Sequence, residues 1–508
     1  MFAEASTLAS PISYERRRPE QTLLYKVIQE NLQTFLDQVH AKGDKLPDFV
    51  KDEFLAFLDC GVLAKGFLRL QCQGCHHEKL IALSCKKRGF CPSCGTKRMI
   101  ETSALLMNHV IPKVAVRQWV LSFPFALRYL LVSDPKIMAK ILKITTNCIS
   151  SFLCKKSGFT KKQAKTAAVT LLQRFGGSAN LNLHILFVDG VYTVNDTQTA
   201  AVFHRLPTPS AKDVGAVLNA ISRKVLSYLK KSGHLTKDLE QVSLNLQNPN
   251  SGLDRIVGHS ITYRIAYGPR AGQKVFTIKT QDPEEYSNSG GLTAADQGFS
   301  MHGGTSCEQH ERKKLEFLCR YIARPALSED RLSLAANGNV ILKLKTPYSN
   351  GTTHINFSPL EFVEKLAALV PRPRIHLIRF HGLFAPHAKH RKLIVPNPEP
   401  EPKLQLAACG SDQAMPGEVD KPKVSKYRIS WARLLKRVFD IDVNICQNCG
   451  AKVKIVAAIV SPYLIKKILK HLQLAYEPPK VATSRGPPMT QGDDLDDLDF
   501  NQQTNYED

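Results

Sequence analysis

Apolar residues near the start of the chain recur every three or four positions, which is the spacing of an amphipathic helix. This first stripe comprises Leu23, Leu24, Val27, Ile28, Leu32, Phe35, Leu36 and Val39. Similar spacing, together with stop signals such as Pro112, predicts further helices along the chain. They are Arg98–Ile111, Ile137–Leu153, Lys161–Phe175, Ser430–Phe439 and a short helix that starts at Ser461.

Other segments are short, apolar and rich in β-branched or aromatic residues, which is typical of strands. The clearest is Leu181–Val188, which ends at the turn residues Asp189 and Gly190. Because helices and strands interleave, the pattern predicts an α+β fold. The other predicted strands are Gln118–Phe123, Ser260–Ala266, Lys274–Lys279 and Val340–Leu344.

Composition suggests where the chain divides into domains. Residues 396–427 are rich in Pro, Glu, Lys and small residues, which is typical of a linker. The end of the chain is polar and carries the acidic run Asp493–Asp499, which favours disorder. The predicted units are an N-terminal domain 1–112, a central domain 113–395, the linker, a C-terminal helical segment 428–475 and a tail 476–508.

The charge of the chain points to a polyanionic partner. With 69 Lys and Arg against 45 Asp and Glu, the formal net charge is +24. The sequence shows neither a signal peptide nor an apolar run long enough to span a bilayer, so we expect no membrane. Thirteen cysteines, several in CxxC pairs, favour metal thiolates in a reducing compartment over a disulfide framework. A cytoplasmic, nucleoid-associated protein is therefore expected.

The most specific motif is a pair of CxxC knuckles, which predicts a four-thiolate zinc site. Its ligands are Cys72, Cys75, Cys91 and Cys94. The same stretch is strongly basic, and this charge favours direct contact with DNA over a purely structural zinc module with a solvated face. The candidate DNA-binding residues are Lys86, Lys87, Arg88, Lys97 and Arg98.

A third CxxC pair, Cys446 and Cys449, stands far from the others in the sequence. Two interpretations stay open: half of a zinc site that is completed elsewhere, or a knuckle kept for its turn geometry. A redox role is less favoured, since nothing around the pair resembles a thioredoxin βαβ unit.

A candidate nucleophile, Tyr321, lies in a short predicted helix that ends at Pro325. Arg320 and Arg324 flank its phenol. Because a phenol must lose a proton before it attacks a phosphodiester, nearby cations favour the reaction, and arginines also hold phosphate. The alternative is a half-buried tyrosine that packs at a helix end.

Many ordered matches along the chain resemble the HUH-type tyrosine transposases of rolling-circle insertion sequences and their common-region relatives. No single match is specific, but together they cover nearly the whole chain. They include the segments 84–94 (SCKKRGFCPSC), 117–124 (RQWVLSFP), 189–192 (DGVY), 320–325 (RYIARP), 379–382 (RFHG) and 446–450 (CQNCG).

The resemblance implies a fold, a chemistry and a set of residues. The central domain would be an antiparallel sheet with helices, related to rolling-circle replication nucleases, and the cysteine module would bind DNA. Tyr321 matches the nucleophile, which would give a 5′-phosphotyrosine and a free 3′-hydroxyl, with Arg324 beside it. Phe317 stands where some relatives carry a second tyrosine. Mg²⁺ or Mn²⁺ would polarise the scissile phosphate.

The sequence departs from the family at this metal site. The family places a His-hydrophobic-His pair on a central strand before the Asp-Gly-Val-Tyr turn, whereas this strand reads Asn182-Leu-His184. Either Asn182 replaces the first histidine, or two residues are deleted and the histidine after His184 is lost. His302 is a candidate third ligand, and the alternative is a histidine that packs in the core. The expected protein is a transposase that cleaves and rejoins single-stranded DNA, and the alternative is a zinc-dependent DNA-binding protein without nuclease activity.

Overall fold

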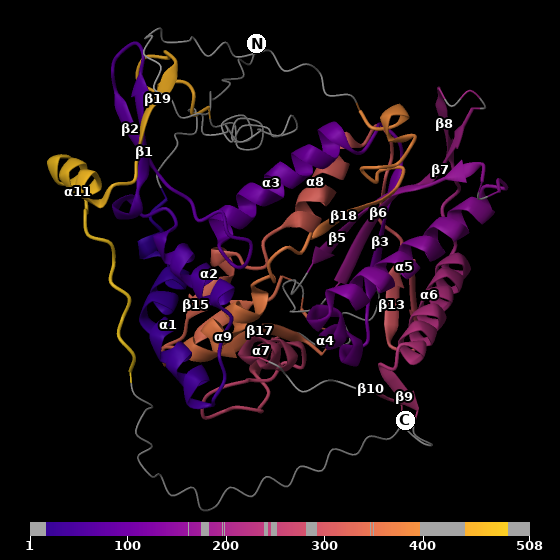
Figure 1. Cartoon of the computed structure of the whole chain (residues 1–508), viewed down its shortest axis with the longest axis horizontal. Helices are drawn as coiled ribbons and strands as arrows, with labels where there is room; N and C mark the ends of the chain where they lie inside the picture. Colours follow the sequence, from indigo (N-terminus) through magenta and orange to yellow (C-terminus); the bar gives the residue numbers. More distant parts are fainter. Residues whose placement is uncertain are drawn as a thin grey trace, which may run out of the picture.

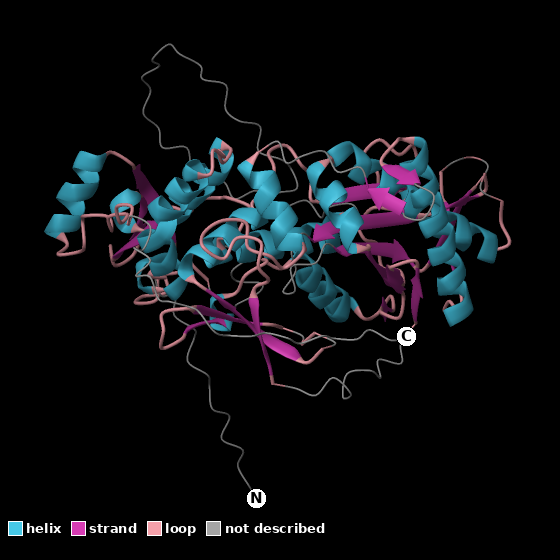
Figure 2. Cartoon of the chain, turned by 90° about the horizontal axis from the view of Figure 1, so that it is seen from below, coloured by secondary structure: helices cyan, strands magenta, loops and turns pink. Residues whose placement is uncertain are grey.

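The computed structural model describes residues 17–485 except 161, 174–181, 196, 198, 238–241, 245–250, 281–291, 346, 349 and 397–441. Within these residues helices and mostly antiparallel strands interleave, so the predicted α+β class is confirmed (Figures 1 and 2). The predicted helix Ser430–Phe439, the linker from residue 397 on and the acidic run Asp493–Asp499 lie outside them. Residues 476–485 of the predicted tail are described and run along α1, where the Ala482 N–H donates to the Gln29 carbonyl.

The N-terminal part joins helices to a small sheet that also contains a C-terminal strand. Thr22 caps α1 by accepting a hydrogen bond from the Tyr25 N–H, and the apolar stripe of α1 is buried. The sheet has the strand order β19-β1-β2, with α11 packed beside it. The elements are α1 (Leu23–Ala41), α2 (Asp48–Asp59), β1 (Phe67–Cys72), β2 (Glu78–Ala82), α3 (Pro92–His109), β19 (Val453–Ile459) and α11 (Pro462–His471).

The central sheet has the order β12-β13-β3-β6-β5-β18, with every neighbouring pair antiparallel, and β14 also pairs with β3. Helices α5 and α6 cover one face, while α3 and α8 cover the other (Figure 1). The elements are β3 (Val116–Ser122), α5 (Pro135–Lys156), β5 (Ala167–Gln173), β6 (Asn182–Val188), α6 (Ala211–Lys231), β12 (Thr293–Asp296), β13 (Phe299–His302), β14 (Ser306–Cys307), α8 (Arg312–Ala323) and β18 (Ile378–Gly382).

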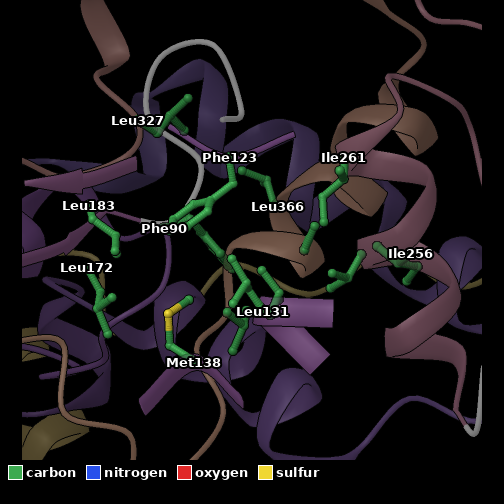
Figure 3. Packing of buried hydrophobic residues seen from close by; sticks show 14 of the residues in the cluster. Phe90, Phe123, Leu131, Met138, Leu172, Leu183, Ile256, Ile261, Leu327 and Leu366 are labelled. Carbon is green, nitrogen blue, oxygen red and sulfur yellow. The ribbon is translucent and has the colours of Figure 1, made fainter. Parts of the chain in front are cut away.

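A second sheet of order β11-β17-β16-β15 packs with α9 and α7 against the N-terminal helices. The loop between β2 and α3, residues 83–91, is called the cysteine loop. Figure 3 shows that Phe90 from this loop, Phe123 after β3 and Leu366 from α9 belong to one buried core. This shared core fixes the cysteine module against the central sheet. The elements are α7 (Gly252–Ile261), β11 (Phe276–Lys279), β15 (Leu332–Leu334), β16 (Val340–Lys343), β17 (Thr352–Phe357) and α9 (Pro359–Leu369).

The remaining described elements are the helix α4, which packs in the main core beside α5 and α7, and two small sheets. A three-stranded sheet has the order β4-β7-β8, and β9 pairs with β10. Their bounds are α4 (Phe125–Ser133), β4 (Ala164–Lys165), β7 (Gly190–Val194), β8 (Ala201–Arg205), β9 (Leu235–Lys237) and β10 (Val242–Leu244).

Two predicted elements are wrong. The predicted helix 161–175 contains the strands β4 and β5, because β5 is buried on both faces between β6 and β18 and so lacks alternation. A short buried run does not distinguish strand from helix. The predicted strand 260–266 begins inside α7, which starts earlier, where Ser251 accepts a hydrogen bond from the Asp254 N–H.

Helix α5 is long and apolar enough by composition to cross a membrane, which the sequence did not lead us to expect. More than half of its most apolar stretch, 56%, is buried inside the structure. Its buried side chains, among them Ile141, Leu142 and Ile149, belong to the main core beside α6, so α5 packs here as a core helix.

Candidate functional site

Eight cysteines of the described residues form two groups of four, and the sulfurs of each group lie within 4.8 Å of one another. The inner group joins Cys60, after α2, to Cys85, Cys91 and Cys94. Its Sγ–Sγ distances include 3.4 Å from Cys85 to Cys94 and 3.7 Å from Cys91 to Cys60. A tetrahedral zinc ion with Zn–S bonds near 2.3 Å would space its sulfurs by about 3.8 Å. The group is therefore a four-cysteine zinc-binding site.

The inner site is built at the start of α3. Cys91 is the N-cap residue and Cys94 lies in the first turn, where the positive end of the helix favours thiolates. The backbone N–H of Cys85 donates to Cys60 Sγ at 3.3 Å. Three of the four thiols are buried, so this site belongs to the core of the N-terminal part.

The outer group joins residues that are far apart in the sequence. Cys72 ends β1 and Cys75 follows it, while Cys446 and Cys449 precede β19. Cys72 Sγ lies 3.4 Å from Cys449 Sγ, and Cys75 Sγ lies 3.6 Å from Cys446 Sγ. Hydrogen bonds from the backbone of Cys75 and of Gly74 lower the pKa of Cys72 to about 6, which favours the thiolate. This is a second zinc-binding site of four cysteines.

Close packing of the two knuckles explains one glycine. A side chain at Gly74 would bring its Cβ within 2.8 Å of Ala451 Cβ, so only glycine fits there. The Gln73 N–H donates to the Lys452 carbonyl at 2.9 Å, and β1 pairs with β19 along its whole length. The outer site therefore joins the C-terminal segment to the N-terminal module.

The predicted ligand set of Cys72, Cys75, Cys91 and Cys94 is wrong as a single site. The structure divides these residues between the two groups, with Cys60 and Cys85 completing the inner one. Those two cysteines lack CxxC spacing, so spacing alone could not reveal them. The interpretation of Cys446 and Cys449 as half of a site completed elsewhere matches the geometry.

The basic residues of the cysteine loop and of the start of α3 divide into two kinds. Arg88 donates to the carbonyls of Ile375, at 2.7 Å, and Arg372, at 3.4 Å. Arg98 donates to the carbonyls of Lys87 and Lys86, each at 3.1 Å. Both arginines therefore hold the loop against its surroundings. Of the lysines, Lys86 is exposed, and Lys87 and Lys97 are half-buried.

Tyr321 lies near the C-terminal end of α8 on its solvent side. The opposite side of the helix, with Leu315, Cys319 and Ile322, is buried against the sheet. Tyr321 is 42% exposed. Arg324 Cζ lies 4.1 Å and Lys345 Nζ 4.2 Å from the ring centroid. This placement favours an accessible phenol beside two cations over a tyrosine packed into the helix end.

A third cation, Arg331, lies near these two. Burial and the charge of Arg324 both lower the pKa of Arg331, and burial, then Arg324, lowers the pKa of Lys345. The Nη1 atoms of Arg324 and Arg331 are buried without a hydrogen-bond partner. Among the described residues none of these three cations forms an ion pair with a carboxylate. Cations that repel one another and keep unused donors favour an anion beside Tyr321.

The zinc module contacts the end of the Tyr321 helix directly. A side chain at Gly95, in the first turn of α3, would place its Cβ 2.7 Å from Pro325 Cβ. A cavity of about 130 Å³ lies here, lined among others by Arg88, Gln173 and Arg324. The inner zinc site, the arginine that follows Tyr321 and the edge of the central sheet therefore form one region.

His184 lies on the α8 face of β6 with both ring nitrogens engaged. Nδ1 lies 2.8 Å from Gln118 Nε2, and Nε2 lies 2.8 Å from Gln173 Oε1. Burial, with a contribution from Arg324, lowers the pKa of His184 to about 4. Asn182 Oδ1 accepts a hydrogen bond from Ser122 Oγ at 2.8 Å.

His302 and His184 each pair with Val120, so they lie on the same face but two strand spacings apart, about 10 Å between backbones. Apart from the cysteine sites, no three His, Cys, Asp or Glu side chains of the described residues converge. Mg²⁺ and Mn²⁺ prefer carboxylate oxygens. Around His184 the structure offers one imidazole and neutral amide side chains that are already hydrogen-bonded. These groups do not fit the divalent metal that the resemblance implies.

Two further positions bear on the choice of nucleophile: Tyr192, the other candidate phenol, and Phe317, where some relatives carry a second tyrosine. Tyr192, on strand β7 directly after β6, is 4% exposed, and burial raises its pKa. Its ring packs at 5.1 Å from that of Phe203. Phe317, one turn before Tyr321, is 64% exposed. Of Tyr192 and Tyr321, only Tyr321 is accessible and beside cations.

Comparison with known proteins places these features in a family. Residues 27–123, which contain the inner site and Cys72 and Cys75, match the transposase zinc-binding domain of the IS91 type. Residues 167–392, which contain β5, β6 and Tyr321, match the Y2_Tnp domain, described as a putative transposase. No curated protein and no solved structure matched the chain. The chain belongs to the IS91 family of rolling-circle transposases.

Proposed function

We propose that this transposase cleaves and rejoins single-stranded DNA at the ends of its mobile element, with Tyr321 as the nucleophile. The observation that carries the proposal is the exposed phenol close to Arg324 and Lys345, near the buried and unused donors of Arg324 and Arg331. A phosphodiester that enters this place would bring its negative charge to three cations and its phosphorus to the phenol oxygen.

The cleavage step follows from this placement. The Oη of Tyr321 bonds to phosphorus as the bond from phosphorus to the 3′-oxygen breaks, so the DNA 5′-phosphate becomes a phosphotyrosine. The phenol proton passes to solvent, which reaches the exposed ring, and the leaving 3′-oxygen takes up a proton. Attack by a 3′-hydroxyl on the phosphotyrosine reverses the step and rejoins DNA. Arg324, Arg331 and Lys345 stabilise the charge that develops on the phosphoryl oxygens.

No step of this proposal uses a divalent metal, because the donors around His184 do not fit one as they stand. His184 instead belongs to a hydrogen-bonded row of Gln118, His184 and Gln173 on the sheet. Gln173 also lines the cavity next to Arg324, so this row supports the floor of the region in which the DNA would lie.

DNA would enter across the cysteine loop. Lys86, Lys87 and Lys97 are the proposed phosphate contacts, since they belong to one basic stretch beside the inner zinc site and Lys86 is exposed. Arg88 and Arg98, which donate to backbone carbonyls, would position the loop. The expected setting is the cytoplasm, on the nucleoid, which agrees with the net charge of +24.

A second function is favoured by the changed histidine pair. A chain that keeps both zinc sites and its basic loop but cannot cleave would be a zinc-dependent DNA-binding protein, either a decayed copy or a regulator. The hydrogen-bonded His184 is the observation that supports this alternative.

One experiment separates the two functions. The protein is incubated with a labelled single-stranded oligonucleotide from the element end and then denatured in detergent. The proposed enzyme gives a labelled band that survives denaturation, lost in Tyr321→Phe and kept in Tyr192→Phe, the control with a buried phenol. Binding without such a band, in wild-type protein, would establish the DNA-binding alternative.

A further inference from the structure

Helix α11 carries a basic stripe on the side that faces away from the protein. Ile465 and Leu469 are buried against the residues before β1, together with Phe67. The opposite side presents Tyr463, Lys466, Lys467 and Lys470, all exposed and spaced i, i+3, i+4 and i+7. These four residues are called the α11 stripe.

The charge around the α11 stripe is strongly one-sided. From residue 442 to 485 the chain has seven Lys and Arg, whereas its acidic residues are Asp442 and Glu477. Glu78, on the neighbouring strand β2, is already paired with Arg69. The lysines of the stripe form no ion pair in the described part of the chain. Such a surface is complementary to a polyanion.

The structure holds this helix firmly at the periphery of the molecule (Figure 1). The outer zinc site and the pairing of β19 with β1 fix the chain before α11. After α11 the chain runs back along α1, where the Ala482 N–H donates to the Gln29 carbonyl and the Arg485 N–H donates to Thr34 Oγ1, each at 3.0 Å. A helix anchored on both sides presents its charges in fixed positions.

We propose that the α11 stripe binds double-stranded DNA next to the element end, as a second DNA-binding surface separate from the cysteine loop. This inference rests on the proposed function only for the identity of the DNA. A helix of ten residues is about 15 Å long, and the major groove admits a helix. Three lysines on one side would contact phosphates, and Tyr463 lies within the same stripe.

The duplex is favoured over a single strand because the surface offers little for unpaired bases. Strand-binding proteins combine a basic groove with several stacking aromatic rings. The α11 stripe has one aromatic residue, and Tyr476 is already beside Lys466, whose Nζ lies 5.5 Å from its ring centroid. A convex helical surface with three lysines fits a groove between two phosphate backbones.

The test compares two triple variants of the full-length, zinc-loaded protein. The first is Lys466→Gln, Lys467→Gln and Lys470→Gln. The control, Lys224→Gln, Lys230→Gln and Lys231→Gln, removes the same charge from exposed positions on α6. Affinity is measured for a duplex from the element flank and for the single-stranded end between about 50 and 200 mM salt. Over this range an affinity that depends on phosphate contacts falls steeply.

If three phosphate contacts are lost, the slope of log affinity against log salt falls by about 2.7 for the duplex. Over this fourfold change in salt, the affinity of the wild type then drops roughly 40-fold more than that of the α11 variant. The α6 control keeps the wild-type slope, and the α11 variant still forms the Tyr321 adduct on single-stranded DNA.

An α11 variant with the wild-type duplex slope would overturn the proposal, as would an equal loss in the α6 control. A loss confined to the single strand would overturn the assignment to duplex. Failure of the adduct in all proteins, with the duplex effect intact, would count against the proposed nucleophile and leave the α11 surface standing.

Discussion

Replacing Arg324 tests how the site handles the charge of the phosphate. Arg324 lies over the ring of Tyr321, and its Nη1 is buried without a partner. A hydrogen bond to a charged group contributes about 1.5–3 kcal/mol. If Arg324 makes one such bond in the transition state, Arg324→Gln should slow adduct formation roughly 10- to 150-fold. Binding of the oligonucleotide should change much less.

Arg320 provides a matched control one turn earlier on α8. Its Nη2 lies 2.8 Å from Glu316 Oε1, so its charge is already balanced. An i, i+4 pair of this kind contributes about 0.3–0.5 kcal/mol, and Arg320→Gln should change the rate less than about threefold. The assay is single-turnover adduct formation with excess protein. Equal rates for wild type and Arg324→Gln, or equal losses in both variants, would refute the reasoning.

Three further predictions concern metal, the lost histidine and pH. Metal analysis should give two Zn²⁺ per chain in the wild type and one in the double variant Cys446→Ser, Cys449→Ser; two ions in that variant would contradict the outer site. Asn182→His should create adduct formation that depends on Mn²⁺, because the side chain at position 182 lies on the same face of β6 as His184. If only a two-residue insertion after His184 creates this activity, the chain carries a deletion. The pKa of His184 is about 4 when folded and near 6.5 when unfolded, so its contribution to stability is full above pH 6.5 and is lost as pH falls toward 4. Urea unfolding should show a loss of about 2 kcal/mol from pH 7 to 5, reduced in His184→Gln; an unchanged loss would place the acid sensitivity elsewhere.

The family, the fold class and a candidate nucleophile could be predicted from the sequence, since these rest on local motifs. The helix around Tyr321 ends just before Pro325, as its pattern predicted, and the described strand β6 lies within the predicted Leu181–Val188. The helix predicted over residues 161–175 was wrong because a fully buried strand shows no alternation of apolar and polar residues. Its burial depends on neighbours from distant parts of the chain, β6 and β18.

The zinc ligands also depend on contacts between distant parts of the chain, which sequence spacing does not reveal. Two CxxC pairs near each other in sequence predicted one site, but β19 pairs with β1 and brings Cys446 and Cys449 to Cys72 and Cys75. Only this long-range pairing decides which thiols meet. Likewise Lys345 and Arg331 have no sequence proximity to Tyr321 that would mark them as its neighbours.

The direct test of the central claim is to locate the covalent bond. Wild-type protein is reacted with a single-stranded oligonucleotide from the element end, digested with nuclease and protease, and sequenced by mass spectrometry. The proposed mechanism predicts a nucleotide phosphate attached to the peptide that contains Tyr321, whose exposed ring lies close to Arg324 and Lys345. A nucleotide on any other residue, or no modified peptide when wild-type protein binds the oligonucleotide, would contradict it.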